Sequence, residues 1–200
     1  IKEKGQFKPI ELDNFVEDLD HPKNKLKWKI EGAKELKVQM DGSHKVTVTQ
    51  PNPNWHGSEK VKFTVTDPEG ATDSRTVTFT VESVNDAPEF VRELKDQTID
   101  EKKQFQKIKL DEYVKDADHK NSELSWDVDV KHQGKEPESG TLNVNIDESR
   151  VASIEIPDTY WNGTAIATFT CTDPEGASIK QAVTLTVNSI NDKPVFTKIP

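Results

Sequence analysis

Hydrophobic and polar residues alternate in several short stretches of the chain. An apolar residue stands at every second position, usually with Lys or Thr between, at 26–30, 61–65, 77–81, 124–128 and 183–187. Because successive side chains of a strand point to opposite faces, this period of two predicts half-buried β-strands. The segments LDNFV at 12–16 and LDEYV at 110–114 are expected to form no more than a helical turn each.

The strand pattern occurs twice, because the chain contains an internal repeat. Residues 55–90 align without a gap with 161–196, and 19 of the 36 positions are identical. Residues 1–21 align with 99–119 at an offset of 98, against an offset of 106 in the other alignment, so the second copy is longer by 106 − 98 = 8 residues. The extra residues are expected in an exposed loop at 131–141, KHQGKEPESGT, which is rich in polar residues.

The repeat predicts two modules rather than one large domain. Each copy has the length of a small β-sandwich, about 100 residues. We therefore expect an all-β chain with modules at 1–88 and 89–200, the first of which begins with a shortened first strand. Since the chain lacks an initiator Met, we expect it to be a fragment of a longer protein.

Composition narrows the classes of function. The net charge of −9 argues against nucleic-acid binding, which needs a basic patch, whereas acidic groups suit hard cations such as Ca²⁺. The single cysteine, Cys171, excludes an intrachain disulfide and is expected to be a small buried hydrophobe. No apolar run has the length that a bilayer requires, so we expect no direct membrane insertion.

Three motifs occur in both copies in the same order. They are Trp-x-Gly at 55–57 and 161–163, Asp-Pro-Glu-Gly at 67–70 and 173–176, and Val/Ile-Asn-Asp-x-Pro-x-Phe at 84–90 and 190–196. Their combination resembles the cadherin-like repeats of bacterial and archaeal surface proteins, over nearly the whole chain. The resemblance implies tandem Greek-key, immunoglobulin-like β-sandwiches, stacked in rows with neighbouring modules of an extracellular or cell-surface protein, where they act as adhesion or spacer units.

The same resemblance implies calcium ions at the junction between modules. Mapped by motif, the candidate junction ligands are Glu3, Asn85, Asp86, Asp116, Asp118 and Asp173. Two orphan half-sites would face further modules and comprise Asp18, Asp20, Asp67, Glu101, Asn191 and Asp192. The chain lacks the family's mid-module Asp-Arg-Glu motif and its longer linker motif, which leaves two alternatives, one ion or none. Asp67 and Asp173 also have a purely structural interpretation, because Asp-Pro-Glu-Gly is a turn sequence.

A second class of function depends on aromatic residues. If exposed, the four tryptophans Trp28, Trp55, Trp126 and Trp161 would favour a carbohydrate-binding or accessory module of a polysaccharide-degrading system. Their equivalent positions in the two copies instead favour core packing. His21 and His119 follow the Asp-x-Asp pairs and are expected to be solvated turn residues. No catalytic site is expected, because nearly every distinctive residue occurs twice. A protein ligand, a glycan ligand and homophilic contact all stay open.

Overall fold

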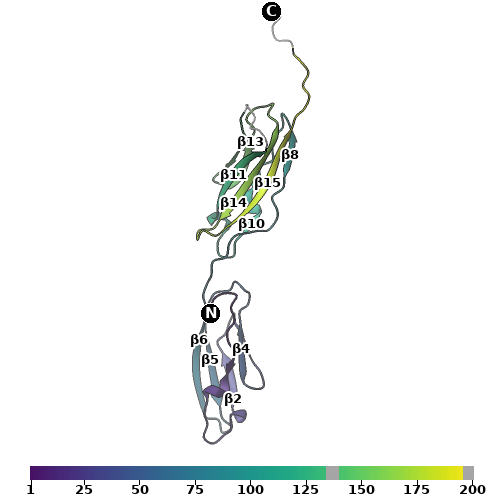
Figure 1. The fold of residues 1–200 in the computed structure, drawn as a ribbon. Helices are drawn as coiled ribbons and strands as arrows, with labels where there is room; N and C mark the ends of the chain where they lie inside the picture. The colour runs from purple at the N-terminus through teal and green to yellow at the C-terminus, as the bar shows by residue number, and fades with distance from the viewer. Residues whose placement is uncertain (134–139, 196–200) are drawn as a thin grey trace, which may run out of the picture. The chain divides into compact units, whose positions relative to one another are not determined.

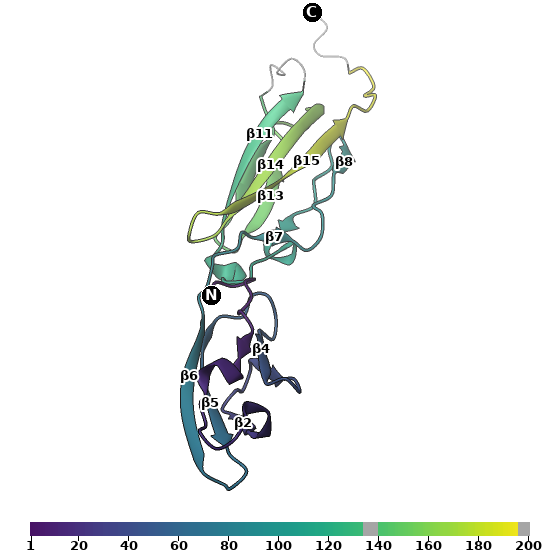
Figure 2. The same cartoon turned by 60° about the horizontal axis from the view of Figure 1, so that its bottom comes forward.

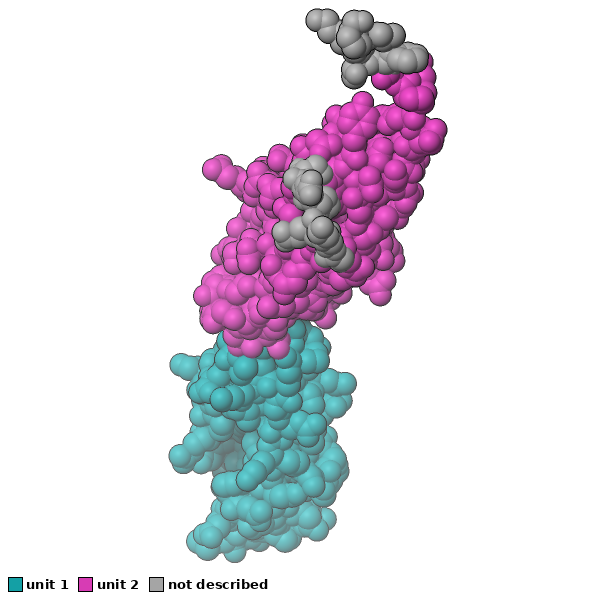
Figure 3. Space-filling view, turned by 45° about the horizontal axis from the view of Figure 1, so that its top comes forward, with its two compact units in different colours: residues 1–84 teal, residues 85–200 magenta. Residues whose placement is uncertain are grey.

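The computed structural model describes residues 1–133 and 140–195. The chain divides into two compact units, Ile1–Val84 and Asn85–Pro200, called unit 1 and unit 2 below (Figure 3). The division falls after residue 84, whereas the repeat places the boundary after residue 88. Among the described residues, no helix has the length and apolarity needed to cross a membrane.

Unit 1 consists of two three-stranded antiparallel sheets. The first has the order β2-β5-β6 and comprises Lys27–Glu31, Gly57–Thr66 and Thr72–Val81 (Figure 1). The second has the order β1-β4-β3 and comprises Ile10–Glu11, Lys45–Thr49 and Lys37–Met40. In the second sheet β4 lies between strands that precede it in sequence, which is the non-sequential order expected of a Greek key.

Unit 2 repeats this arrangement and adds strands to it. Its larger sheet has the order β11-β14-β15-β8 and comprises Ser125–Gln133, Gly163–Thr172, Ser178–Asn188 and Gln97–Asp100 (Figure 2). Its second sheet has the order β12-β13-β9 and comprises Asn143–Ile146, Val151–Glu155 and Ile108–Lys109. A separate antiparallel pair joins β7 (Glu89–Phe90) to β10 (Val114–Lys115). Strand β8 pairs in parallel with β15 and forms one edge of the larger sheet.

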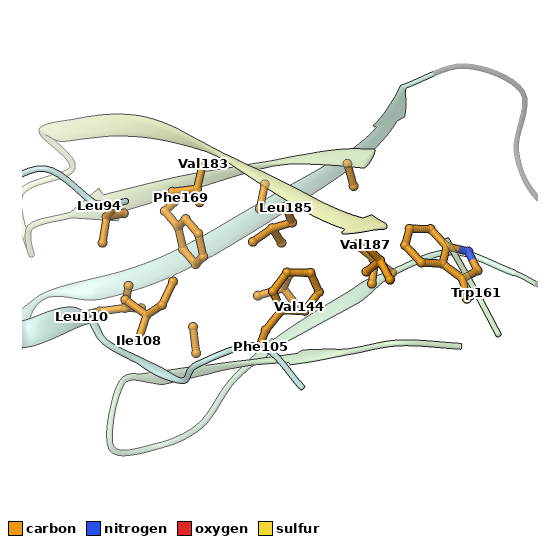
Figure 4. Packing of buried hydrophobic residues seen from close by; sticks show 14 residues of the cluster. Leu94, Phe105, Ile108, Leu110, Val144, Trp161, Phe169, Val183, Leu185 and Val187 are labelled. Carbon is orange, nitrogen blue, oxygen red and sulfur yellow. The ribbon is translucent and has the colours of Figure 1, made fainter. Parts of the chain in front are cut away.

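The core of unit 2 lies between its two sheets. Phe169 and Leu185 of the larger sheet are fully buried, and Val144 and Ile108 of the other sheet face them (Figure 4). The alternation predicted for 183–187 is confirmed, since its apolar residues are buried and its Thr residues are more exposed. Cys171 is buried too, as expected, and it packs with Leu124 and Trp126.

The expected helical turns are confirmed as short 3₁₀ segments. They are η1 (Leu12–Phe15) and η3 (Leu110–Glu112), and two further 3₁₀ turns lie at η2 (Lys23–Lys25) and η4 (Asn121–Glu123). The first residue of η1 and of η3 is a buried leucine. Each turn therefore fixes one apolar side chain in its core.

The longer second copy differs from the expectation at its insertion. Residues 131–133 were expected in a loop, but they belong to β11 and pair with 164–166 of β14. The expectation was wrong there because the partner strand is long enough to continue the ladder. His132, within this extension, accepts a hydrogen bond at Nε2 from the backbone N–H of Leu142 at 3.1 Å. Residues 134–139 of the expected loop lie outside the described residues.

Candidate cation site

The first part of the site is the turn that follows β10. Asp116 Oδ1 accepts the backbone N–H groups of Asp118 at 2.8 Å and His119 at 2.9 Å. The Asp116 side chain is 0% exposed, and its second oxygen, Oδ2, has no hydrogen-bond partner within the described part of the chain. A buried carboxylate oxygen without a donor is costly in free energy, so this atom indicates a missing partner.

The second part is the Asp-Pro-Glu-Gly turn after β14. The Asp173 backbone C=O accepts the N–H of Gly176 at 3.1 Å, and Gly176 has a φ of 93° that favours glycine. The segment therefore forms the turn that its sequence predicts, which leaves open whether Asp173 is also a ligand. Asp173 is nevertheless buried, and its Oδ1 accepts the N–H of Ala177 at 2.9 Å. The residue serves the turn and also holds a carboxylate inside unit 2.

The third part is the segment that begins unit 2. The Asn85 side chain donates from Nδ2 to Asp173 Oδ2 at 2.8 Å, and the backbone N–H of Asp86 donates to Asp118 Oδ2 at 2.7 Å. Two segments about 30 and 90 residues further along the chain thus converge on 85–86. Five of the six predicted junction residues lie together in unit 2, namely Asn85, Asp86, Asp116, Asp118 and Asp173.

The sixth residue, Glu3, belongs to unit 1. Its side chain is buried, Oε1 lies 2.9 Å from His56 Nδ1, and Oε2 has no hydrogen-bond partner within the described residues. A site that combines Glu3 with the five residues of unit 2 stays a prediction.

His119 also belongs to this cluster, although it was expected to be a solvated turn residue. Its side chain is 14% exposed, with Nδ1 at 3.1 Å from Asp116 Oδ1 and Nε2 at 2.8 Å from Glu175 Oε2. Ligand atoms of His119, Asp116 and Asp173 lie within 4.8 Å of one another. The signal available in the sequence was the recurrence of Asp-x-Asp-His in both copies.

The electrostatics of the cluster are those of crowded carboxylates. Burial raises the pKa of Asp173, but the hydrogen bond from Asn85 and several backbone N–H groups outweigh burial and hold the pKa below its ordinary value. Burial lowers the pKa of His119, but its hydrogen bond with Asp116 and the negative charges of Glu175, Asp116 and Asp173 raise that pKa overall. The cluster therefore attracts positive charge.

Unit 1 contains a more open version of the same arrangement. Asp18 Oδ1 accepts the N–H groups of Asp20 at 2.9 Å and His21 at 2.7 Å, and Asp18, His21 and Asp67 form a second close cluster. The Asp18 side chain is 19% exposed, and Asp20 is exposed. Water can therefore solvate these carboxylates, unlike the buried Asp116.

The other predicted half-site lies in unit 2 without forming one cluster. Glu101 is buried and accepts a hydrogen bond at Oε1 from Asn162 Nδ2 at 3.0 Å. Asp192 forms an ion pair with Lys102, and Asn191 is exposed. Whether these residues bind an ion with a further module stays a prediction.

The tryptophans do not form an exposed platform. Trp161 is 1% exposed and donates from Nε1 to the Gly140 C=O at 3.0 Å. Trp55 is half-buried and donates from Nε1 to Glu35 Oε2 at 2.6 Å. Trp28 and Trp126 are also half-buried, and their indole N–H groups are shielded from solvent. The core-packing interpretation describes these positions better than a sugar platform does.

Solved structures with a similar fold are ectodomains of cadherin proteins. Protocadherin Gamma B2 extracellular cadherin domains 1–5 is 16% identical and covers 98% of this chain and 40% of its own, with a TM-score of 0.46. Human protocadherin-24 EC1-2 is 14% identical and covers 88% of this chain and 86% of its own, with a TM-score of 0.48. The chain spans only 27–41% of the length of three such protocadherin structures. No curated protein matches the sequence.

The family match is independent of those structures. The model of the bacterial Ig domain matches the chain twice, at residues 3–80 and at residues 85–186. The two matches coincide with the two units and with the two copies of the repeat. Together with the paired antiparallel sheets of each unit, they show that the chain belongs to the bacterial Ig domain family, as two tandem Ig-like β-sandwich repeats.

Proposed function

We propose that the chain is a pair of repeat modules from a larger extracellular or cell-surface protein, where it acts as a noncatalytic spacer and adhesion unit, and that unit 2 binds Ca²⁺ beside the linker. The match of both units to the bacterial Ig domain family supports the first part. The geometry of Asp116 supports the second.

The single observation that carries the calcium proposal is the buried Asp116 Oδ2 atom. It has no donor within the described residues, although Asp116 Oδ1 beside it receives two backbone N–H groups. Hydrogen bonds alone therefore leave half of this carboxylate unsatisfied. A cation at Oδ2 would supply the missing interaction and reduce the repulsion from Asp173.

The donor set fits a hard cation. Ca²⁺ takes about 6–8 oxygen ligands from carboxylates, amide carbonyls and water. The carboxylates of Asp116, Asp118 and Asp173, that of Asp86, and the amide oxygen of Asn85 are the groups of unit 2 that would hold it. Borderline metals prefer several nitrogen or sulfur ligands, whereas His119 is the single such donor within the described cluster. A bound ion would connect 85–86 to both turns and so stiffen the linker.

Thermal unfolding with calcium and with chelator tests this proposal. A ligand at 100 times its Kd stabilises the folded state by about 2.7 kcal/mol. For a domain of this size we expect the Tm of unit 2 to rise by about 10–20 °C, since 1 kcal/mol shifts Tm by about 4–8 °C. Small-angle scattering should show a narrower distribution of shapes with calcium. Identical melting and scattering in both buffers would contradict the calcium proposal.

Matched variants locate the ion. Asp116→Asn should abolish the calcium-dependent rise, because Oδ2 is replaced by a donor. Asp18→Asn, the equivalent change in unit 1, should leave the response of unit 2 unchanged. If both variants lose the calcium-dependent rise in Tm equally, the ion does not bind at Asp116. The adhesion partner, whether protein, glycan or a second copy, is proposed only as a class of surface ligand.

A further inference from the structure

The sheet β2-β5-β6 of unit 1 presents exposed lysines on its outward face. Side chains alternate along β2 and β5, so Trp28 and Phe63 pack in the core and their neighbours point outward. Among the described residues of the three strands, Glu31 is the single acidic residue on the outward face. This surface is called the lysine face below, and its exposed lysines are Lys27, Lys29, Lys60 and Lys62.

The strand register brings the lysines together with a set of hydroxyl groups. Glu31 lies opposite Lys62 in the β2–β5 pair. Lys29 precedes Glu31 by two residues on the same face, so it is a diagonal neighbour of Lys62. The lysine face therefore offers ammonium and hydroxyl groups over three adjacent strands, which are labelled in Figure 1. The hydroxyl groups on β6 belong to Thr72, Ser74, Thr76, Thr78 and Thr80.

The positive charge of the lysine face is only partly compensated. Lys29 Nζ lies 2.7 Å from Glu31 Oε1. This hydrogen bond and the positive charges of Lys29 and Lys62 hold the pKa of Glu31 below its ordinary value. Lys27 and Lys60 form no ion pair within the described part of the chain. Four positive charges thus accompany one negative charge, which leaves a net charge of +3 on this surface.

Unit 2 lacks this feature, although it contains the equivalent sheet. By sequence, residues 1–84 contain 13 basic and 14 acidic residues and have a net charge of −1, whereas residues 85–200 contain 14 basic and 22 acidic residues and have a net charge of −8. The positions of unit 2 that are equivalent to the four lysines carry Ser125, Asp127, Ile166 and Thr168. The shared fold therefore does not require the lysines, and they are candidates for a function of unit 1 alone.

Protection of a sheet edge does not account for the whole lysine face. Lysines on an edge strand prevent pairing with strands of other chains, and β2 is an edge strand. Lys60 and Lys62 belong to the central strand β5 instead, and Lys62 lies between Glu31 and Thr76. Edge protection therefore leaves the lysines of β5 unexplained.

The chemistry of the lysine face favours an anionic polysaccharide as its partner. Ammonium groups attract carboxylate or sulfate groups, and Ser and Thr hydroxyls both donate and accept hydrogen bonds, as sugar hydroxyls do. Within the described residues, the outward positions of β2, β5 and β6 carry no aromatic side chain. Single-stranded nucleic acids stack their bases on aromatic side chains, and protein interfaces are enriched in aromatic residues and depleted of lysine. A chain of acidic sugars fits this surface better than either.

We propose that the lysine face of unit 1 binds an anionic polysaccharide. Its four lysines pair with the acid groups of the polysaccharide, and the hydroxyl groups of β6 form hydrogen bonds with the sugar hydroxyls. This inference names the partner class of the adhesion role proposed above and rests on that role, but it does not depend on the calcium site. Because the lysines are exposed, added salt screens their charges and should weaken binding.

Isothermal titration of the whole chain with dextran sulfate tests the proposal, with uncharged dextran of the same length as the reference. The wild-type chain should bind the sulfated polymer and not the uncharged one. The triple variant Lys29→Gln/Lys60→Gln/Lys62→Gln should bind about tenfold more weakly, because each exposed ion pair contributes a factor of a few. A wild-type chain that does not bind dextran sulfate, or that binds uncharged dextran equally, would overturn the proposal.

A matched variant separates the lysine face from net charge. Lys103→Gln/Lys107→Gln/Lys109→Gln removes the same charge at exposed positions of unit 2 and should bind dextran sulfate as the wild type does. Equal weakening in the two triple variants would overturn the assignment to the lysine face. Tighter binding to a single-stranded oligonucleotide than to dextran sulfate at the same salt concentration would overturn the polysaccharide as the partner.

The melting of unit 2 with calcium, measured on the same samples, distinguishes failure of this inference from failure of the proposed function. An unchanged calcium response without binding to dextran sulfate would refute the inference and leave the calcium proposal intact. Binding to uncharged dextran that survives the three lysine changes of unit 1 would also refute it, while supporting adhesion through another surface.

Discussion

Asn85 donates a hydrogen bond to Asp173 across 88 residues of sequence, from Nδ2 to Oδ2 at 2.8 Å. The donor lies at the start of unit 2 and the acceptor in the turn after β14. The bond attaches the linker-side segment to a buried carboxylate, so the position of the segment and the charge of the turn are coupled.

Asn85→Ala should destabilise unit 2 without added calcium. The change removes a donor to the buried, ionised Asp173, and a hydrogen bond to a charged group contributes about 1.5–3 kcal/mol. Urea unfolding measures the free energy. Asn191→Ala is the control, because the equivalent Asn191 forms no side-chain hydrogen bond within the described residues, and it should change stability by less than about 0.5 kcal/mol. Similar changes in the free energy of unfolding for the two variants would contradict a stabilising role of the hydrogen bond from Asn85.

Cys171 should be unreactive in the folded protein. Burial, reinforced by the negative charges of Asp116, Asp111 and Asp173, raises its pKa to about 12. Below that pH the thiol stays protonated, and the nucleophilic thiolate forms only as pH rises through the folded pKa. We expect no alkylation by iodoacetamide at about pH 8.5, where an unperturbed thiol is half ionised, and complete alkylation in denaturant. Mass spectrometry measures the extent of alkylation in the native and in the denatured protein. Rapid labelling of the native chain would contradict the buried position.

Cys171→Val should be tolerated. The equivalent residue of unit 1 is Val65, and the thiol of Cys171 packs among Val114, Leu124 and Trp126. Apolar swaps of similar volume cost less than about 1.5 kcal/mol, whereas Cys171→Asp would bury an unpaired charge and should prevent folding of unit 2. Circular dichroism melting distinguishes these outcomes. Strong destabilisation by valine would mean that the thiol has a role beyond packing.

Trp161→Ala should be the more damaging of two equivalent tryptophan changes. Trp161 is almost completely buried, so truncation leaves a cavity and lowers the free energy of unfolding by about 3–5 kcal/mol. Trp55 is half-buried, so Trp55→Ala should lower the free energy of unfolding by less. Fluorescence quenching by acrylamide provides a second measurement, in which the Trp161 indole should be strongly shielded. Easy quenching of all four indoles would favour the carbohydrate-binding alternative again.

The strands and the duplication could be predicted because their signals are local. The alternation at 61–65 and 183–187 reflects the period of the pleat, and it holds whatever the partner strand is. The extension of β11 through residue 133 could not be predicted in the same way. A polar stretch such as Lys131–His132–Gln133 has no apolar face to mark it, and its pairing depends on the length of β14.

The candidate site likewise has features that the sequence predicts and features that depend on the tertiary structure. By itself the sequence determined the fold class and the two modules through its repeat, whereas the residues of both turns and the linker were implied by the resemblance to a family. Tertiary structure alone decided that Asp116 is buried with an unsatisfied oxygen, that His119 lies among the carboxylates, and that Val77 is exposed where Val183 is covered. The physical reason is that burial and hydrogen bonding depend on segments distant in sequence, such as Leu94 on Gln181, and no local pattern encodes their presence.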